Sequence, residues 1–88
     1  MARVTVVLPA VLTAPQPQRE VACEAGTPLE ALRAAAALVP ALAPRLFQGE
    51  RPLVSVSLNG RLLTPAETAA AALADGDRVG AHPPVAGG

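Results

Sequence analysis

The sequence contains no lysine, tryptophan or tyrosine, and Phe47 is its only aromatic residue. A hydrophobic core therefore has to be built mostly from alanine, valine and leucine, although 51% of the residues are hydrophobic. The 88 residues predict one small domain, which buries about 60–65% of the surface of the extended chain.

Cysteine and histidine occur once each, as Cys23 and His82. A single cysteine excludes an intramolecular disulfide and a cysteine-rich metal site. One imidazole adds too few soft ligands for a zinc site built by this chain alone. Cys23 lies in a stretch of alternating polarity, so it is interpreted as a small, half-buried hydrophobic residue. His82 is interpreted as an exposed residue at the end of a strand.

Neither charge sign is in excess, because seven arginines balance seven acidic residues. This balance argues against non-specific binding to nucleic acid or to an anionic membrane surface. No segment approaches the roughly 20 apolar residues of a membrane span, and no signal-peptide pattern opens the chain. The expectation is a cytoplasmic protein without nucleic-acid or membrane partners.

The N-terminal third predicts two strands joined by a loop. Residues 3–8 are rich in β-branched side chains and would place Val4, Val6 and Leu8 on one face. Prolines after residue 8 predict an irregular connection as far as Gln18. Alternation resumes over residues 19–25, which predicts the second strand.

A helix is predicted to begin at Thr27, whose hydroxyl would cap the amide of Glu30 while the Glu30 carboxylate bonds back. Its buried stripe is predicted from helical spacing: Leu29, Leu32, Ala36 and Val39. Pro40 and Pro44 are expected to end the helix and its trailing turn. Leu46 and Phe47 are expected to pack beneath it.

The C-terminal half predicts a hairpin, a short helix and a last strand. Residues 53–58 alternate, and Asn59-Gly60 is the strongest two-residue hairpin signal. Thr64-Pro65-Ala66-Glu67 repeats the capping-box pattern and predicts a short helical turn. Asp75-Gly76-Asp77 is interpreted as a turn, because a calcium loop needs several more oxygen ligands. Residues 78–82 are predicted to form the final strand.

The order of elements predicts the fold class. One helix among about five strands has to cover one face of a mixed sheet. The last strand is expected to lie beside the first, with the C-terminal tail leaving at the edge of the sheet. This layout is an α+β β-grasp, or ubiquitin-like, fold. Residues 1–82 are predicted to form the domain and residues 83–88 a flexible C-terminal tail.

The tail itself is the most informative segment. Gly87 and Gly88 carry no side chains, so they can pass through a narrow channel in another protein and present a carboxylate there. Pro83 and Pro84 favour an extended backbone, so the tail is expected to project from the domain.

Two motifs resemble the ThiS/MoaD family of ubiquitin-like sulfur carriers: Leu73-Ala74-Asp75-Gly76-Asp77-Arg78-Val79, and Pro83-Pro84-Val85-Ala86-Gly87-Gly88. Within that family, residues 8–13 and 38–47 are more similar to carriers used in cysteine synthesis (the CysO type). The small subunit of molybdopterin synthase is the alternative, because it ends in a similar tail.

The resemblance implies a function for Gly88. An E1-like adenylyltransferase/sulfurtransferase of the MoeB/ThiF type would use ATP and Mg²⁺ to adenylate the Gly88 carboxylate. A sulfur donor would then form a thiocarboxylate, which passes sulfur to an accepting synthase. Pro84, Val85, Ala86, Gly87 and Gly88 would enter the active site of each partner. The domain would bind no cofactor and supply no catalytic residue. Arg61 and Arg78 could dock on the partner but are interpreted as solvated.

Two further classes stay open. The tail could be joined to lysines of target proteins, as in ubiquitin-like modifiers, although this lysine-free chain could not form chains through its own side chains. A β-grasp interaction module with incidental glycines is the other class. An independent enzyme is the least favoured reading, because the sequence presents no nucleophile–base pair, phosphate-binding glycine loop or metal-ligand cluster.

Overall fold

The computed structural model describes residues 1–13 and 19–83. The strands among them are β1 (Ala2–Leu8), β2 (Arg19–Ala25), β3 (Phe47–Gln48), β4 (Arg51–Pro52), β5 (Ser55–Leu58), β6 (Arg61–Leu62) and β7 (Arg78–His82). The helices are α1 (Ala10–Thr13), α2 (Pro28–Leu38), the 3-10 turn η1 (Pro40–Leu42), α3 (Ala43–Leu46) and α4 (Pro65–Ala70).

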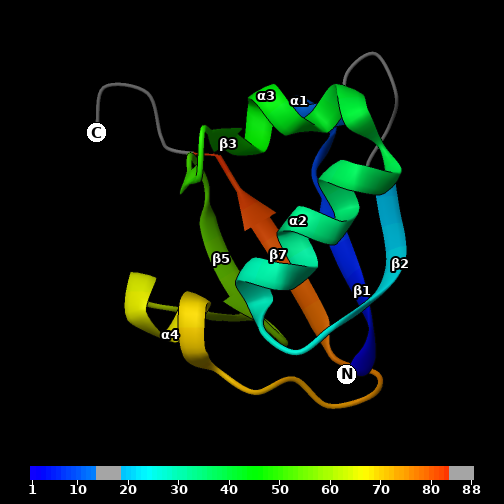
Figure 1. Ribbon diagram of the computed structural model, residues 1–88, viewed down its shortest axis with the longest axis vertical. Helices are drawn as coiled ribbons and strands as arrows, with labels where there is room; N and C mark the ends of the chain where they lie inside the picture. The colour runs from blue at the N-terminus through cyan, green and yellow to red at the C-terminus, as the bar shows by residue number, and fades with distance from the viewer. Residues whose placement is uncertain (14–18, 84–88) are drawn as a thin grey trace.

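Five of the strands form one mixed sheet in the order β2-β1-β7-β5-β6. β1 and β7 run parallel, and the other neighbouring pairs are antiparallel. α2 crosses one face of this sheet, as Figure 1 shows. This is the β-grasp arrangement that the sequence predicted. We call the face away from α2 the open face.

The position of β7 corrects one expectation. β7 does lie beside β1, as predicted, but it is also paired with β5 on its other side. It is therefore the central strand of the sheet. The chain leaves the sheet from the end of a central strand and not from a lateral edge.

The core lies between the sheet and α2. β1 contributes Val4, Val6 and Leu8, which are at most 2% exposed, as the alternation predicted. The stripe predicted for α2 is partly wrong: Leu32 is buried, whereas Leu29, Ala36 and Val39 are only partly so. The residues of α2 that face the sheet most closely are Pro28, Ala31, Leu32 and Ala35. Small side chains on this face let the helix lie close to the strands.

Of the two hydrogen bonds predicted at the start of α2, one is confirmed. The Thr27 hydroxyl accepts from the Glu30 amide at 3.2 Å. The Glu30 carboxylate, however, accepts from the amide of Gly26 at 2.9 Å and not from that of Thr27. The carboxylate therefore stabilises the turn before the helix.

Two short helices lie where the sequence predicted none. α1 forms one turn directly after β1, because Pro9 precedes its first residue and the next prolines, Pro15 and Pro17, come after Thr13. α3 contains Pro44 near its start, where a missing amide costs no helical hydrogen bond, so this proline does not end the helical region. The Arg45 guanidinium joins the two helices by donating to the carbonyl of Leu12 at 2.8 Å. Leu46 is fully buried, as expected.

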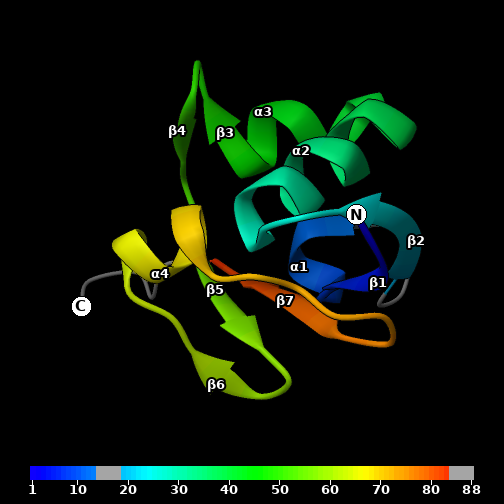
Figure 2. The same cartoon turned by 60° about the horizontal axis from the view of Figure 1, so that its bottom comes forward.

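The hairpin and the capping box are confirmed. Asn59 and Gly60 have φ of 51° and 89° and connect β5 to β6, with Leu58 opposite Arg61. At α4, the Thr64 hydroxyl accepts from the Glu67 amide and the Glu67 carboxylate accepts from the Thr64 amide. Figure 2 shows α4 and β6 on the same side of the molecule as β5. The β3–β4 hairpin, which turns at Gly49 with φ of 63°, was not predicted.

The described part of the chain contains no helix with the length and apolarity needed to cross a membrane.

Candidate functional site

The candidate site is the C-terminal segment together with the strand that leads to it. Pro84, Val85, Ala86, Gly87 and Gly88 lie outside the described residues, so their predicted role stays a prediction. The structure describes β7 and the following Pro83. The geometry at the end of β7 therefore determines where the tail starts.

The end of β7 has a different set of neighbours from its beginning. Pairing with β1 reaches from Arg78 to Gly80, opposite Thr5 to Val7. Pairing with β5 reaches from Val79 to His82, opposite Leu58 to Ser55. Ala81 and His82 are thus paired with β5 alone among the described strands.

His82 and Ser57 form a hydrogen bond on the open face, with His82 Nε2 and Ser57 Oγ 2.9 Å apart. Ser57 is only 6% exposed. Gly80 lies directly opposite Ser57 in the sheet. A Cβ atom built on Gly80 would be 2.5 Å from Ser57 Oγ and 3.0 Å from His82 Nε2. The imidazole therefore lies back over Gly80, in space that a side chain at that position would occupy.

His82 is exposed at the end of β7, as predicted, and its imidazole also bonds to Ser57. A serine–histidine pair is therefore present although the sequence showed no nucleophile–base pair. Nothing in the sequence joins two residues that are 25 positions apart. The alternation of residues 53–58 did place Ser57 on the outer face, which was the only available signal. Among residues 1–13 and 19–83, no hydrogen bond reaches the other ring nitrogen of His82. In this part of the chain, the pair is therefore without the third group that orients the base in a catalytic triad.

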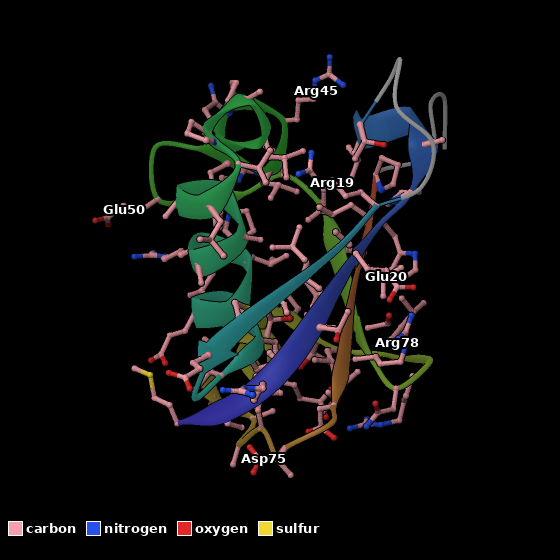
Figure 3. All side chains as sticks on the ribbon, turned by 90° about the vertical axis from the view of Figure 1, so that its right-hand side faces the viewer. Arg19, Glu20, Arg45, Glu50, Asp75 and Arg78 are labelled. Carbon is pink, nitrogen blue, oxygen red and sulfur yellow. The ribbon has the colours of Figure 1, made fainter. Side chains whose placement is uncertain are left out.

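Two arginines that were interpreted as solvated are paired. Arg78 Nη2 lies 2.9 Å from Glu20 Oε2, and both side chains are 51% exposed. Figure 3 shows this pair on the side of the sheet away from α2. The hydrogen bond from Arg78 lowers the pKa of the Glu20 carboxyl group. Arg61 lies 3.3 Å from Glu67 at the start of α4. Exposed pairs of this kind contribute little to stability.

The Asp75-Gly76-Asp77 segment is a turn, as predicted. The Asp75 carboxylate accepts from the amide of Arg3 at 2.8 Å. One oxygen of Asp77 accepts from the Ala74 amide at 2.8 Å and the other from the Asn59 side-chain amide. These bonds lower the pKa of Asp77, chiefly through the Ala74 amide. Within the described residues, no three His, Cys, Asp or Glu side chains gather as metal ligands.

Cys23 is buried at the boundary between β2 and α2. Its thiol lies 3.8 Å from the carbonyl oxygen of Ala31. Burial raises the pKa of the thiol. These observations fit the structural role that its alternating sequence predicted, and they give no support for a nucleophilic role.

Comparison with known proteins gives a consistent group. A family model described as the ThiS family matches residues 7–88. No curated protein matches the chain. Among solved structures, the chain is similar to small archaeal modifier protein 1 of H. volcanii, with 28% identity and a TM-score of 0.73, covering 97% of this chain and 100% of that one.

Two further solved structures extend this group. The Haloferax volcanii HVO 2177 protein shares 30% identity at a TM-score of 0.66, covering 99% of this chain and 89% of that one. A chain in the complex of subunits 1 and 2 of molybdopterin-converting factor from Helicobacter pylori 26695 shares 26% identity at a TM-score of 0.59. That match covers 98% of this chain and 99% of the other. The similarity thus includes both a modifier protein and a chain of a molybdopterin-converting factor.

Proposed function

Because the chain belongs to the ThiS family, we propose that it is a sulfur carrier whose Gly88 carboxylate is activated and converted to a thiocarboxylate. The observation that carries the proposal is the extent of the family match, which runs to residue 88 and so includes Gly87-Gly88. The end of β7 supports it, because Pro83 follows a strand held in the centre of the sheet.

The proposed chemistry takes place in partner enzymes. A carboxylate is a poor electrophile because its charge is delocalised and it lacks a leaving group. A carboxylate oxygen of Gly88 attacks the α-phosphorus of ATP, and pyrophosphate leaves. Sulfide then attacks the acyl carbon, the bond to the AMP oxygen breaks, and AMP departs, which gives a thiocarboxylate on Gly88. Where a persulfide is the donor, the same attack gives an acyl disulfide, and a thiol must then attack the donor's sulfur to release the thiocarboxylate and form a disulfide. Mg²⁺ bound with ATP in the partner neutralises phosphate charge.

The domain acts as a co-substrate in this scheme. Its folded part docks on an adenylating enzyme of the MoeB/ThiF type, and residues 84–88 enter the active site. Tethering raises the effective concentration of the terminal carboxylate at the catalytic centre. The thiocarboxylate then donates sulfur to an accepting synthase. We place this reaction in the cytoplasm, and we propose cysteine or another sulfur-containing metabolite as the product, as in CysO-type carriers.

Two alternatives are each favoured by one similarity. The likeness to an archaeal small modifier favours attachment of Gly88 to lysines of other proteins. The likeness to a chain of molybdopterin-converting factor favours a role as a synthase small subunit. All three functions require adenylation of Gly88. They differ in the nucleophile that takes the acyl group and in the final acceptor.

The experiment that tests the proposal is the intact mass of the protein after incubation with ATP, Mg²⁺, the adenylating enzyme of the same cells and a sulfide donor. We expect a gain equal to replacement of one oxygen by sulfur, located at Gly88. A protein lacking Gly87-Gly88 serves as the control and should stay unmodified while unfolding at the same temperature. No mass gain in the full-length protein would contradict the carrier function. Recovery of Gly-Gly remnants on lysines of other proteins would instead select the modifier.

A further inference from the structure

The last residues of β7 pair with fewer neighbouring strands than the rest of β7 does. From Arg78 to Gly80 the strand is paired with β1, and from Val79 it is paired with β5. Beyond Gly80 only the pairing with β5 continues. A strand end with one hydrogen-bonded neighbour opens more easily than one with two. The segment that leads directly to Pro83 is therefore where β7 is most prone to separate from the sheet.

A side-chain link reinforces this segment on its paired side. His82 Nε2 and Ser57 Oγ are 2.9 Å apart, and Ser57 belongs to β5. The link therefore runs from the last residue of β7 to the one strand that still pairs with it. Ser57 is only 6% exposed. Its hydroxyl is largely shielded from water while the imidazole of the exposed His82 lies over it, so the bond contributes a net amount typical of one hydrogen bond.

Gly80 is what allows the link to form. The imidazole lies back over this glycine, and a Cβ at position 80 would come within 2.5 Å of Ser57 Oγ. Contacts this short do not persist, so an alanine at position 80 would push the hydroxyl or the ring aside. The backbone conformation does not itself require glycine here, since only Gly49, Gly60 and Gly76 among the described glycines have positive φ. The need for glycine at position 80 comes from the space that the link occupies.

We propose that His82 is a positioning residue that, through Ser57, sets the direction in which the C-terminal segment is presented to the adenylating enzyme. This inference rests on the function proposed above. The next residue is Pro83, whose ring restricts φ, so the orientation of the His82 backbone limits the orientation of Pro83, from which the chain continues. A strand end that opens would spread the terminal carboxylate over more directions. A smaller fraction of encounters would then be productive.

The first test measures the strand end directly by amide hydrogen exchange in the intact protein. In the Ser57→Ala variant, we expect the slower of the Ala81 and His82 amides to exchange about fivefold faster, the size expected for loss of one hydrogen bond. Val79, which is paired on both sides, should be unchanged. Ser55→Ala is the matched control, because Ser55 lies on the same strand and face but is exposed. Equal exchange in Ser57→Ala and wild type would overturn the inference.

The second test measures ATP–pyrophosphate exchange catalysed by the adenylating enzyme with this protein as the substrate. We expect Ser57→Ala and His82→Ala to raise KM about fivefold with kcat unchanged, because a docked tail still reaches the same active site. Ser55→Ala should match wild type. A lower kcat with unchanged KM, or wild-type kinetics in both variants, would overturn the positioning role. Absence of exchange with the wild-type protein would instead contradict the proposed function.

A double-mutant cycle separates the link from general effects on the sheet. Gly80→Ala alone should raise KM as much as Ser57→Ala does, because both break the same contact. The Gly80→Ala, Ser57→Ala double variant should then show about the same KM as either single variant. Additive effects would show that Gly80 acts independently of the link, and would overturn its assigned role. Thermal unfolding of all variants shows that each is folded under the assay conditions.

Discussion

Asn59 and Asp77 join the two turns that flank β5 and β7. The Asn59 side-chain amide donates to Asp77 Oδ1 at 3.0 Å. Asn59 Oδ1 accepts from the amide of Arg78 at 2.9 Å, and the amide of Asn59 donates to the carbonyl of the same arginine at 2.8 Å. The other oxygen of Asp77 closes its own turn through the amide of Ala74. The hairpin turn and the turn before the last strand are therefore one hydrogen-bonded unit.

Acid should weaken this unit through Asp77. Hydrogen bonds from Ala74 and Asn59 lower the pKa of its carboxyl group in the folded protein. Because the pKa is lower in the folded state, the ionised carboxylate stabilises the folded protein at pH values above the unfolded-state pKa of about 4. That contribution is lost as the pH falls through the folded-state pKa. We expect the free energy of unfolding, measured with urea, to be level between pH 7 and about 5 and to fall below about pH 4.

The Asp77→Asn variant separates this carboxylate from Glu20 and Glu67, whose pKa values are also lowered by hydrogen-bonded partners. The variant should be less stable than wild type at pH 7, and its loss of stability below about pH 4 should be smaller. An acid dependence as steep as that of the wild type would assign the effect to the glutamates.

Substitution of Asn59 should lower the free energy of unfolding for two reasons that can be measured separately. Its φ of 51° lies in the region that favours glycine, and its side chain bonds to Asp77 and Arg78. Asn59→Gly keeps the backbone freedom and loses the side-chain bonds, so we expect a loss of about 1 kcal/mol. Asn59→Ala adds backbone strain and should lose about 2 kcal/mol or more. Urea unfolding of both variants gives the two values, and equal losses would contradict the strain component.

The features that the sequence predicted correctly are those set by residues close together in the chain. The Asn59-Gly60 hairpin needs two successive residues that tolerate positive φ, and that pattern is local. The capping box at Thr64 joins residues three positions apart. The alternation in β1 identifies which face is buried without any knowledge of what covers it. From these local elements, the order of elements along the chain and the fold class could be predicted, but not the central position of β7 in the sheet.

Two features that could not be predicted depend on the packing of elements against one another. The link between Ser57 and His82 requires β5 and β7 to be in register, which no local pattern specifies. The stripe that helical spacing predicts for α2 is right at Leu32 and partly wrong at its other positions. In the structure, Ala31 and Ala35 face the sheet, while Leu29 is only partly buried. In a helix this rich in alanine, hydrophobic size does not mark the contact face, because the smallest residues permit the closest approach.

Cys23 should react slowly in the folded protein. Its side chain is buried, and burial raises the pKa of its thiol, so less thiolate is present at any pH near neutrality. We expect its reaction with a thiol-specific disulfide reagent at pH 8 to be at least about tenfold slower than that of the same protein in urea. Equal rates in the two conditions would contradict the burial of Cys23 and its structural role.

Two leucines of α2 offer a matched test of where the core lies. Leu32 is fully buried, whereas Leu38 is 61% exposed. Truncation of Leu32 to alanine removes buried methyl groups and leaves a cavity, so we expect the free energy of unfolding to fall by about 2–5 kcal/mol. Leu38→Ala makes the same chemical change on the same helix and should alter it by no more than about 0.5 kcal/mol. Urea unfolding at pH 7 compares the two variants. The change in helix propensity from leucine to alanine is small beside the cost of a buried cavity, so a large difference between the variants reports burial, and similar losses would contradict this orientation of α2.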